Sequence, residues 1–127
     1  MNNFDITDIE EEVIDIIKSI KVTDKVYPNR PKATGSANEF IVVSISGGVI
    51  DKSAYGECTV TISLFAKDNS HFKNGKKLSS MYKKLIERFP SESERLLFDT
   101  EPNILGDTPD DYGFHARIIR IPTIIKI

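Results

Sequence analysis

The sequence predicts an α+β protein in which a mainly antiparallel sheet carries two helices packed on one face, in the order α-β-β-β-α-β-β. Two stretches, residues 6–21 and 73–89, repeat apolar residues at the three- and four-residue spacing of an amphipathic helix. Residues 55–66 alternate apolar and polar side chains, which is typical of a strand with one buried face. The strand-like segments follow one another in runs, and this order favours antiparallel pairing over parallel βαβ units.

The first helix is expected at residues 6–21. Thr7 and Glu10 have the spacing of a capping box. Acidic residues occupy the first turns and Lys18 and Lys21 the last, an order that suits the helix dipole. The acidic cluster is interpreted as a solvated face. The apolar stripe of this helix consists of Ile6, Ile9, Val13, Ile16, Ile17 and Ile20.

A polar crossing follows the first short strand. Residues 22–27 favour a strand that ends at Pro28, and Pro31 stiffens the chain further before the next strand begins. Residues 40–46 are apolar on both faces, which predicts a central strand. The pair Gly47-Gly48 predicts a hairpin turn. The stretch "SGGV" is not a phosphate-binding loop, because it lacks the Lys-Ser/Thr pair.

Residues 55–66 form the clearest predicted strand. Its apolar side chains should point into the core, and they are Cys58, Val60, Ile62 and Leu64. The opposite face carries Glu57, Thr59, Thr61 and Ser63. If both helices cover the first face, water or another subunit must meet the second.

The second helix, residues 73–89, ends before Pro90. The last third favours strands at residues 95–99, 103–105 and 114–127, with the loop "GDTPDDYG" before the final run. Pro122 predicts an edge position or a bulge, because proline cannot donate to a sheet ladder. The apolar stripe of the second helix consists of Leu78, Met81, Tyr82, Leu85, Ile86 and Phe89.

Length and composition predict a single domain, residues 1–127, of ordinary globular character. Hydrophobic residues make up 39% and charged residues 28%, and the formal net charge is -2, which gives no general attraction to nucleic acid or to an anionic membrane. No apolar stretch approaches the ~20 residues that span a bilayer, and the N-terminus lacks the pattern of a signal peptide. The expected localisation is cytoplasmic.

No pattern predicts a catalytic, cofactor or metal site. His71 and His115 have no partner at metal-ligand spacing, and Cys58, the lone cysteine, lies on the apolar side of a strand, where a thiol is a small buried hydrophobe. Asp107, Asp110 and Asp111 lack the spacing and closing glutamate of an EF-hand. We expect no enzyme activity and identify no small-molecule substrate.

The two helices carry opposite charges. The second has six basic residues and one acid, Glu87, between Lys73 and Arg88, whereas residues 5–15 contain six acids and no base. Tyr82 and Phe89 belong to the apolar stripe and do not form a stacking platform for bases. We favour two explanations of these charges over nucleic-acid binding. Either the two helices pair, within the chain or across a subunit boundary, or both charged faces are simply solvated.

Five segments follow one another in a recognisable order. An opening amphipathic helix precedes "KVYPNRPKATGSANEFIVVSI", which is followed by "CTVTISLFA", "GKKLSSMYKKLIERF" and "YGFHARIIRIPTIIKI". This order resembles that of the tail-completion, or tail-terminator, proteins of long-tailed bacteriophages and prophages. The resemblance implies a structural protein that caps the tail tube as a ring, usually a hexamer, and supports head-tail joining. It implies tail-tube and head-completion proteins as partners, no cofactor, and a place in the virion after assembly in the host cytoplasm.

Under this resemblance, two segments are candidates for the interface between subunits. One is the proline-stiffened crossing, where Arg30 and Lys32 would reach acids such as Asp110 and Asp111 of a neighbour. The other is the final strand, which has more aliphatic residues than one half-buried face can hide. The candidate interface residues are Tyr27, Pro28, Arg30, Pro31, Lys32, Ile121, Ile124, Ile125 and Ile127.

Alternative interpretations remain for both segments and for the function. The crossing is equally explained as a plain connection across the end of the sheet, and the last residues as part of the chain's own core. Instead of a ring-forming virion protein, the chain would be a non-enzymatic binding or adaptor module of a mobile element, or a small enzyme of unrecognised type.

Overall fold

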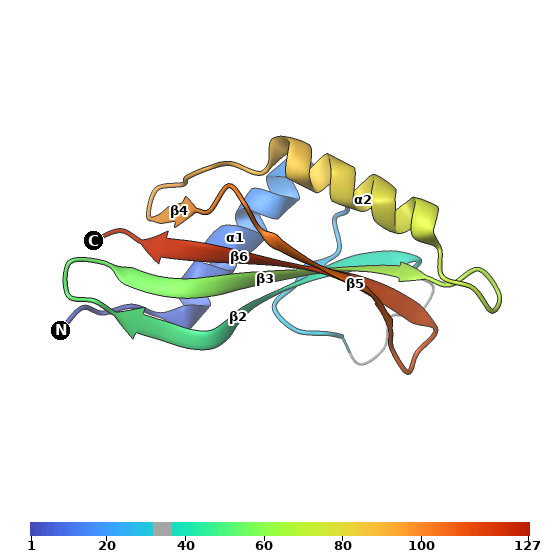
Figure 1. The fold of residues 1–127 in the computed structure, drawn as a ribbon, viewed down its shortest axis with the longest axis horizontal. Helices are drawn as coiled ribbons and strands as arrows, with labels where there is room; N and C mark the ends of the chain where they lie inside the picture. The colour runs from blue at the N-terminus through green and yellow to red at the C-terminus, as the bar shows by residue number, and fades with distance from the viewer. Residues whose placement is uncertain (32–36) are drawn as a thin grey trace.

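The computed structural model describes residues 1–31 and 37–127, which form a six-stranded sheet and two helices (Figure 1). The elements, in chain order, are α1 (Ile6–Ile20), β1 (Val26–Tyr27), β2 (Glu39–Asp51), β3 (Gly56–Lys67), α2 (Gly75–Arg88), β4 (Leu96–Phe98), β5 (Asn103–Pro109) and β6 (Phe114–Ile125). Both chain termini lie at the end of the sheet that carries the β2–β3 hairpin (Figure 1). Neither helix in the described ranges is long and apolar enough to cross a membrane.

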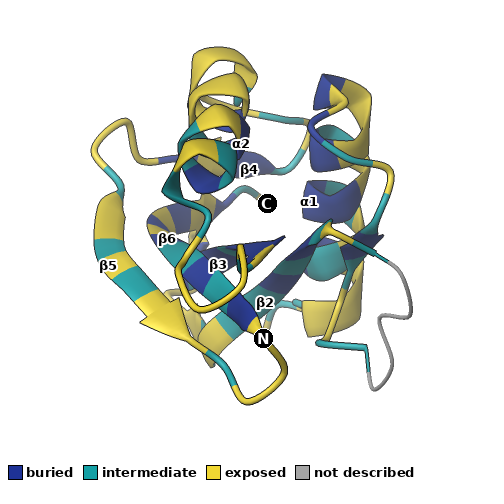
Figure 2. Cartoon of the chain, turned by 90° about the vertical axis from the view of Figure 1, so that its right-hand side faces the viewer, coloured by how far each residue is buried: buried dark blue, intermediate teal, exposed yellow. Residues whose placement is uncertain are grey.

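The two helices pack side by side on one face of the sheet, as the sequence predicts (Figure 2). α1 lies against β1 and β2, and α2 lies against β3 and β6. The apolar side chains of β3 point into the core beneath them, which confirms the predicted alternation: Cys58, Val60, Ile62 and Leu64 are all buried. Ile6 and Ile86, by contrast, are exposed, and Ile14 is buried, so the apolar stripe of α1 is rotated slightly from the prediction and that of α2 is narrower than predicted.

Polar side chains begin both helices. The Asp5 carboxylate accepts a hydrogen bond from the backbone N–H of Thr7 at 2.8 Å, so the predicted capping box of Thr7 and Glu10 is wrong and the cap lies two residues earlier. Asn74 caps α2 through its Oδ1, which accepts from the N–H of Lys77 at 3.1 Å. These caps satisfy N–H groups that have no partner inside the helix.

The strand order is β1-β2-β3-β6-β4, and β5 also pairs with β6. Among the strands of the described residues, only β1 and β2 pair in parallel. β6 is therefore central, which corrects the edge position that Pro122 suggested. The Pro122 carbonyl accepts a hydrogen bond from the N–H of Asp99 at 2.9 Å, at the point where the chain passes from β4 to β5. The nitrogen and the carbonyl of a strand residue face the same side. The missing N–H of Pro122 therefore faces the interval between β4 and β5, where β6 has no strand partner that needs a hydrogen bond from it.

The strand β2 differs from its prediction in two ways. Gly47 and Gly48 do not make the hairpin turn; they lie inside β2, where a bulge shifts the register between Ser46 and Ile50. The chain reverses later, at residues 52–55. In the described part of the chain, β1 pairs only with residues 41–42, so the rest of β2 is an outer edge and not a central strand.

Candidate interaction surface on the open sheet face

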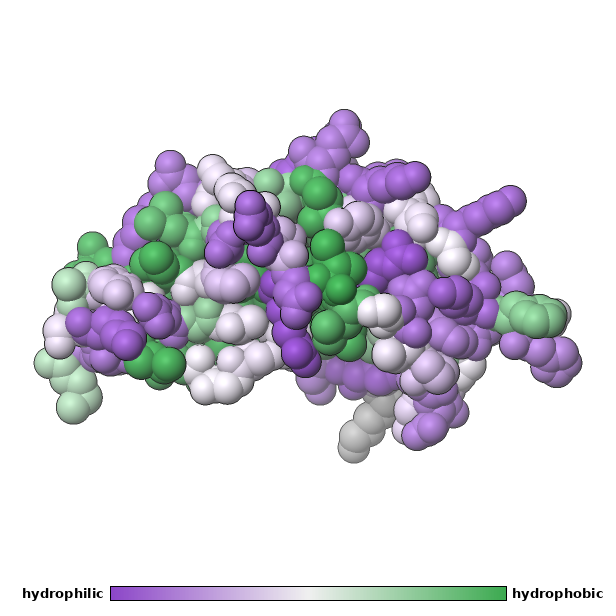
Figure 3. Space-filling model, viewed as in Figure 1, coloured by the Kyte–Doolittle hydropathy of each residue, from purple (hydrophilic) through white to green (hydrophobic). Residues whose placement is uncertain are grey.

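The sheet face opposite the helices, called the open face below, is built from every second residue of β2, β3 and β6. Pairing places these residues in rows across the strands, and the rows differ in character from one end to the other. Toward the end that carries the β5–β6 turn, the rows are aromatic; in the middle they are mostly polar; toward the chain termini they are apolar and exposed. In Figure 3 hydrophobic residues reach the surface toward the termini and in a block near the middle of the view, and the end away from the termini is mostly hydrophilic.

The aromatic end of the open face is a second, small core. Phe40, Phe65 and Phe114 are buried together with Ala116, and Tyr27 packs at their margin. The Phe40 and Phe65 rings stack with centroids 4.5 Å apart, and Phe114 meets Phe40 edge to face at 5.3 Å. Such pairs add about 0.5–1.5 kcal/mol each to the free energy of area burial.

Arg30 covers this aromatic core. Its guanidinium carbon lies 5.1 Å from the Phe40 centroid and 4.5 Å from that of Tyr112. The same group donates to Asp110 Oδ2 through Nη2 at 2.7 Å and Nε at 3.2 Å, and Nη1 donates to the Pro31 carbonyl at 3.0 Å. The predicted reach of Arg30 toward Asp110 of a neighbouring subunit is therefore corrected: the two residues pair within one chain, and Arg30 acts here as a cover.

The Asp110 carboxylate binds backbone N–H groups of the β5–β6 turn. Its Oδ1 accepts hydrogen bonds from the backbone N–H of Tyr112 at 2.8 Å and of Phe114 at 3.0 Å. Burial disfavours the ionised carboxylate, but the hydrogen bonds from Arg30 and from these two N–H groups outweigh it and lower the pKa of Asp110. The side chain is thus a charged anchor that holds the crossing, the turn and the aromatic core together.

The middle of the open face is mostly polar. The hydroxyls of Ser46 and Thr61 are hydrogen-bonded to each other, and Thr61 is buried although it faces away from the helices. Arg120, which is paired in register with Thr61, is exposed. This strip separates the covered aromatic end from the uncovered apolar end.

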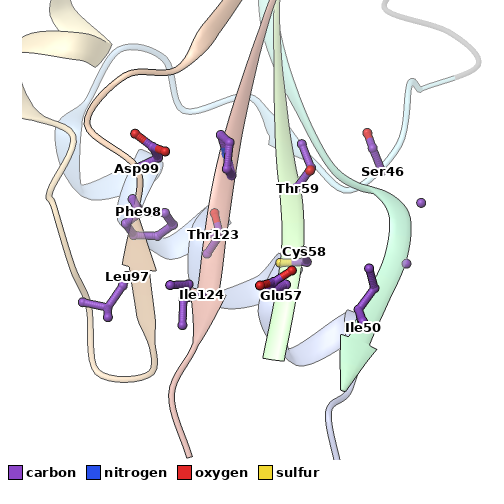
Figure 4. Close-up of a pocket in the computed structure, with 13 residues that line it drawn as sticks. Ser46, Ile50, Glu57, Cys58, Thr59, Leu97, Phe98, Asp99, Thr123 and Ile124 are labelled. Atoms are coloured by element: carbon purple, nitrogen blue, oxygen red, sulfur yellow. The ribbon is translucent and has the colours of Figure 1, made fainter. Parts of the chain in front are cut away.

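The end nearest the chain termini carries an exposed row across four strands. Leu97 of β4 pairs with Ile124 of β6, Ile124 with Glu57 of β3, and Glu57 with Ile50 of β2. Figure 4 shows these four side chains side by side. The aliphatic members keep 39%, 41% and 56% of their surface exposed, for Leu97, Ile124 and Ile50 respectively. Folding of one chain therefore leaves this apolar row uncovered.

A hollow of about 610 Å³ lies over this row, and we call it the sheet hollow. The β2 bulge forms one side of it, where Gly47 and Gly48 carry no side chain and a Cβ atom added to either would meet nothing within 4 Å. Both have positive φ, +74° and +77°, a conformation that favours glycine. Asp99, just after β4, lines the opposite side (Figure 4).

The predicted interface residues are divided by the structure. Ile121 and Ile125 are buried in the chain's own core, so they cannot contact a neighbour, and this corrects their assignment. Tyr27, Arg30 and Pro31 are half-buried in or beside the cover of the aromatic core. Lys32 lies outside the described residues. The members that remain exposed are Pro28, Ile124 and Ile127.

The other residues considered for chemistry are Cys58, His115 and His71. Burial raises the pKa of the Cys58 thiol to about 11, which disfavours the reactive thiolate. His115 Nδ1 lies 2.7 Å from Asp68 Oδ1, and His71 is exposed in the loop before α2. Within residues 1–31 and 37–127, no group of three His, Cys, Asp or Glu side chains is arranged to hold a metal ion.

Asp107 belongs to a separate ion-pair cluster on the helix side of the sheet. Its carboxylate accepts from Arg117 Nε at 2.8 Å and Nη2 at 3.0 Å, and from Lys73 Nζ at 3.1 Å. The Arg117 hydrogen bonds hold the pKa of Asp107 below its usual value. Asp107 and Asp110, considered together in the sequence as calcium ligands, thus each bind an arginine, on opposite faces of the sheet.

The sequence did not identify the sheet hollow. The hollow draws on separate strands, and the sequence of one strand does not reveal which other strands it pairs with. Its residues that the sequence missed are Leu97, Asp99, Glu57 and Ile50. One signal was present: strict alternation in "RIPTII" places Ile124 on the same face as Pro122, opposite to the buried Ile121 and Ile125.

Comparison with known proteins gives no assignment: no protein-family model matches the chain, and no curated protein matches it significantly.

Proposed function

We propose that this chain is a structural virion protein of the tail-terminator type, which assembles as a ring on the end of a phage tail tube and supports head-tail joining. The proposal rests on the resemblance of the sequence segments to that family. It is supported by one structural observation in particular: the row Leu97–Ile124–Ile50 remains exposed on an open sheet face after the chain has folded. Exposed apolar side chains gathered on one face are a common mark of a protein–protein interface, and a protein that joins a tail to a head needs such a surface for its partner proteins.

Measurement of mass and shape in solution tests this function. Native mass spectrometry of the purified chain should give a multiple of its 14.3 kDa mass, six times that mass for a hexamer. Negative-stain images of the same sample should show closed rings with a central opening. A chain that stays monomeric from micromolar to millimolar concentration, and that shows no ring in the images, contradicts the self-assembly on which the proposal depends.

A binding or adaptor module is the second candidate function. The sheet hollow favours it, because it is a concave site of a size in the range, roughly 300–1,000 Å³, of sites that hold ligand groups. The adaptor would act as a monomer or dimer and would use the hollow to hold a partner. Absence of rings together with specific binding at the hollow distinguishes this candidate from the first.

A further inference from the structure

The sheet hollow combines apolar walls with negative charge. Leu97, Ile124 and Ile50 supply the apolar surface, and the Glu57 carboxylate lies between Ile124 and Ile50 in the same row (Figure 4). Asp99 adds a second carboxylate at the margin. No lysine or arginine lines the hollow, and in the described ranges the Glu57 side chain takes part in no ion pair or hydrogen bond.

This combination restricts the chemistry of an occupant. A purely aliphatic segment would bury part of the Glu57 carboxylate without giving it a partner, which costs free energy. An acidic segment would add repulsion to that cost. A lysine or arginine side chain avoids both, because its aliphatic stem covers apolar surface while its charged head donates to a carboxylate.

A second copy of the chain meeting the hollow face to face does not supply such a group. When the two-fold axis passes through the centre of the hollow, Glu57 of one copy meets Glu57 of the other, so the carboxylates of the two hollows are brought together. Lys126, just after β6, is engaged elsewhere: its Nζ donates to the Ser93 carbonyl at 2.8 Å and to Glu92 Oε2 at 3.3 Å. We therefore look for an occupant other than the same hollow of a second copy.

We propose that the sheet hollow binds a segment of a partner protein in which a lysine or arginine is flanked by aliphatic side chains. The basic head would bind Glu57, with Asp99 adding to the attraction, and the flanking aliphatic groups would cover Leu97, Ile124 and Ile50. The hollow would take such a segment whether or not the chain assembles as a ring.

Peptide titration of the full chain, followed by two-dimensional NMR, tests the proposal. The probe is acetyl-Leu-Ile-Lys-Ile-Leu-amide, compared with the same peptide carrying norleucine or glutamate in place of lysine. The lysine peptide should shift the signals of Leu97, Ile124 and Ile50 and bind roughly tenfold more tightly than the norleucine peptide, the low end of what is expected for a hydrogen bond to a charged group. The glutamate peptide should bind most weakly.

Two variants and a matched control complete the experiment. Glu57→Gln should remove most of the preference for lysine, and Ile124→Thr should weaken all three peptides. Ile86→Thr, at an equally exposed isoleucine on α2, should leave binding unchanged. Equal binding of the lysine and norleucine peptides, shifts that map elsewhere, or no binding at all would overturn the proposal. So would an oligomer that Ile124→Thr converts to a monomer, because the hollow would then belong to a second copy.

Discussion

Arg30 is the residue that connects the polar crossing to the sheet. It lies on a proline-stiffened stretch whose own side chains contribute little apolar surface, yet its guanidinium covers four aromatic rings at 4.5–5.6 Å. A planar guanidinium can stack on rings and bind a carboxylate through two N–H groups at once, which a lysine ammonium cannot do. Residues 30–31 are thereby fixed over the aromatic core by one side chain.

Replacement of Arg30 should therefore destabilise the chain. We expect Arg30→Ala to lower the free energy of unfolding by about 2–3 kcal/mol, from lost charge-assisted hydrogen bonds and cation–π contacts, and Arg30→Lys to recover only part of it. Urea unfolding followed by circular dichroism measures this. Arg120→Ala, at an exposed arginine on the same sheet face, is the control and should change stability by less than about 0.5 kcal/mol. Equal effects at the two positions would contradict the role of Arg30.

The partner of Arg30 gives the stability a pH dependence. Because the pKa of Asp110 is lowered from its usual 3.8 in the folded chain, the ionised carboxylate stabilises the fold above that pH, and this contribution is lost as pH falls through the lower folded value. Asp110→Asn should thus be less stable than the wild type by about 1–2 kcal/mol at pH 7. In urea titrations the difference should begin to shrink as the pH falls below the usual pKa of 3.8, and it should vanish only below the lower folded pKa of Asp110, where both side chains are neutral. Asp111→Asn, at the exposed neighbour, should follow the wild type; a gap for Asp110→Asn that stays constant with pH would contradict the ion pair.

At the scale of elements, the sequence predicted local structure well and pairing poorly. Both helices lie within two residues of their predicted bounds, because a 3.6-residue period and a stopping residue such as Pro90 are local signals. The position of a strand in the sheet is not local. β6 is central because β4 and β5 share its second edge, and nothing within "FHARIIRIPTII" reveals that arrangement. The same limit hid the sheet hollow, whose row draws on four strands.

The pair Gly47-Gly48 shows how a correct residue signal can lead to a wrong element. Two glycines indicate positive φ, which a type I′ hairpin turn needs, but a bulge inside a strand needs it as well. The turn itself is formed without glycine at its tip, where Ser53 takes a φ of 71° and its N–H donates to Asp51 Oδ1 at 2.8 Å. The positive φ of Gly47 and Gly48 was predictable from the sequence, but their place in a bulge inside β2 was not.

Alanine at either bulge glycine should cost stability for conformational reasons alone. Gly47→Ala and Gly48→Ala should each lower the free energy of unfolding by about 1–2 kcal/mol, because both sites have positive φ although the new methyl group would meet no atom within 4 Å. Gly106→Ala is the matched control in β5, with equal space and no positive φ, and should be neutral or slightly stabilising. Urea midpoints at constant slope measure the difference; identical midpoints for all three variants would show that the bulge is not held at positive φ.

At the scale of the whole molecule, charge is distributed unevenly over the helical layer. Glu11 and Asp15 on α1, and Lys83 and Lys84 on α2, are all exposed on the outer side of that layer. Among the ion pairs of the described residues, none joins α1 to α2; Glu12 of α1 instead lies 3.8 Å from Arg95, after α2. The opposite charges of the two helices are therefore left for solvent or for a neighbouring copy.

If the chain forms the proposed ring, each contact brings one side of a copy against a different side of the next. We expect α1 of one copy to face α2 of its neighbour, so that Lys83→Glu with Lys84→Glu opposes acid to acid and prevents assembly at low salt. Glu11→Lys with Asp15→Lys opposes base to base and should prevent assembly equally.

An equal mixture of the two variants restores an attractive contact at every boundary between subunits. This requires that the two variants alternate around the ring, and therefore that the ring has an even number of subunits. Native mass spectrometry should then show mixed rings of equal composition, weakened by salt because exposed charges are screened. Unfolding of each monomer should change by less than about 1 kcal/mol, since exposed pairs contribute little. Rings that form normally from either variant alone would show that these faces are solvated in the assembly.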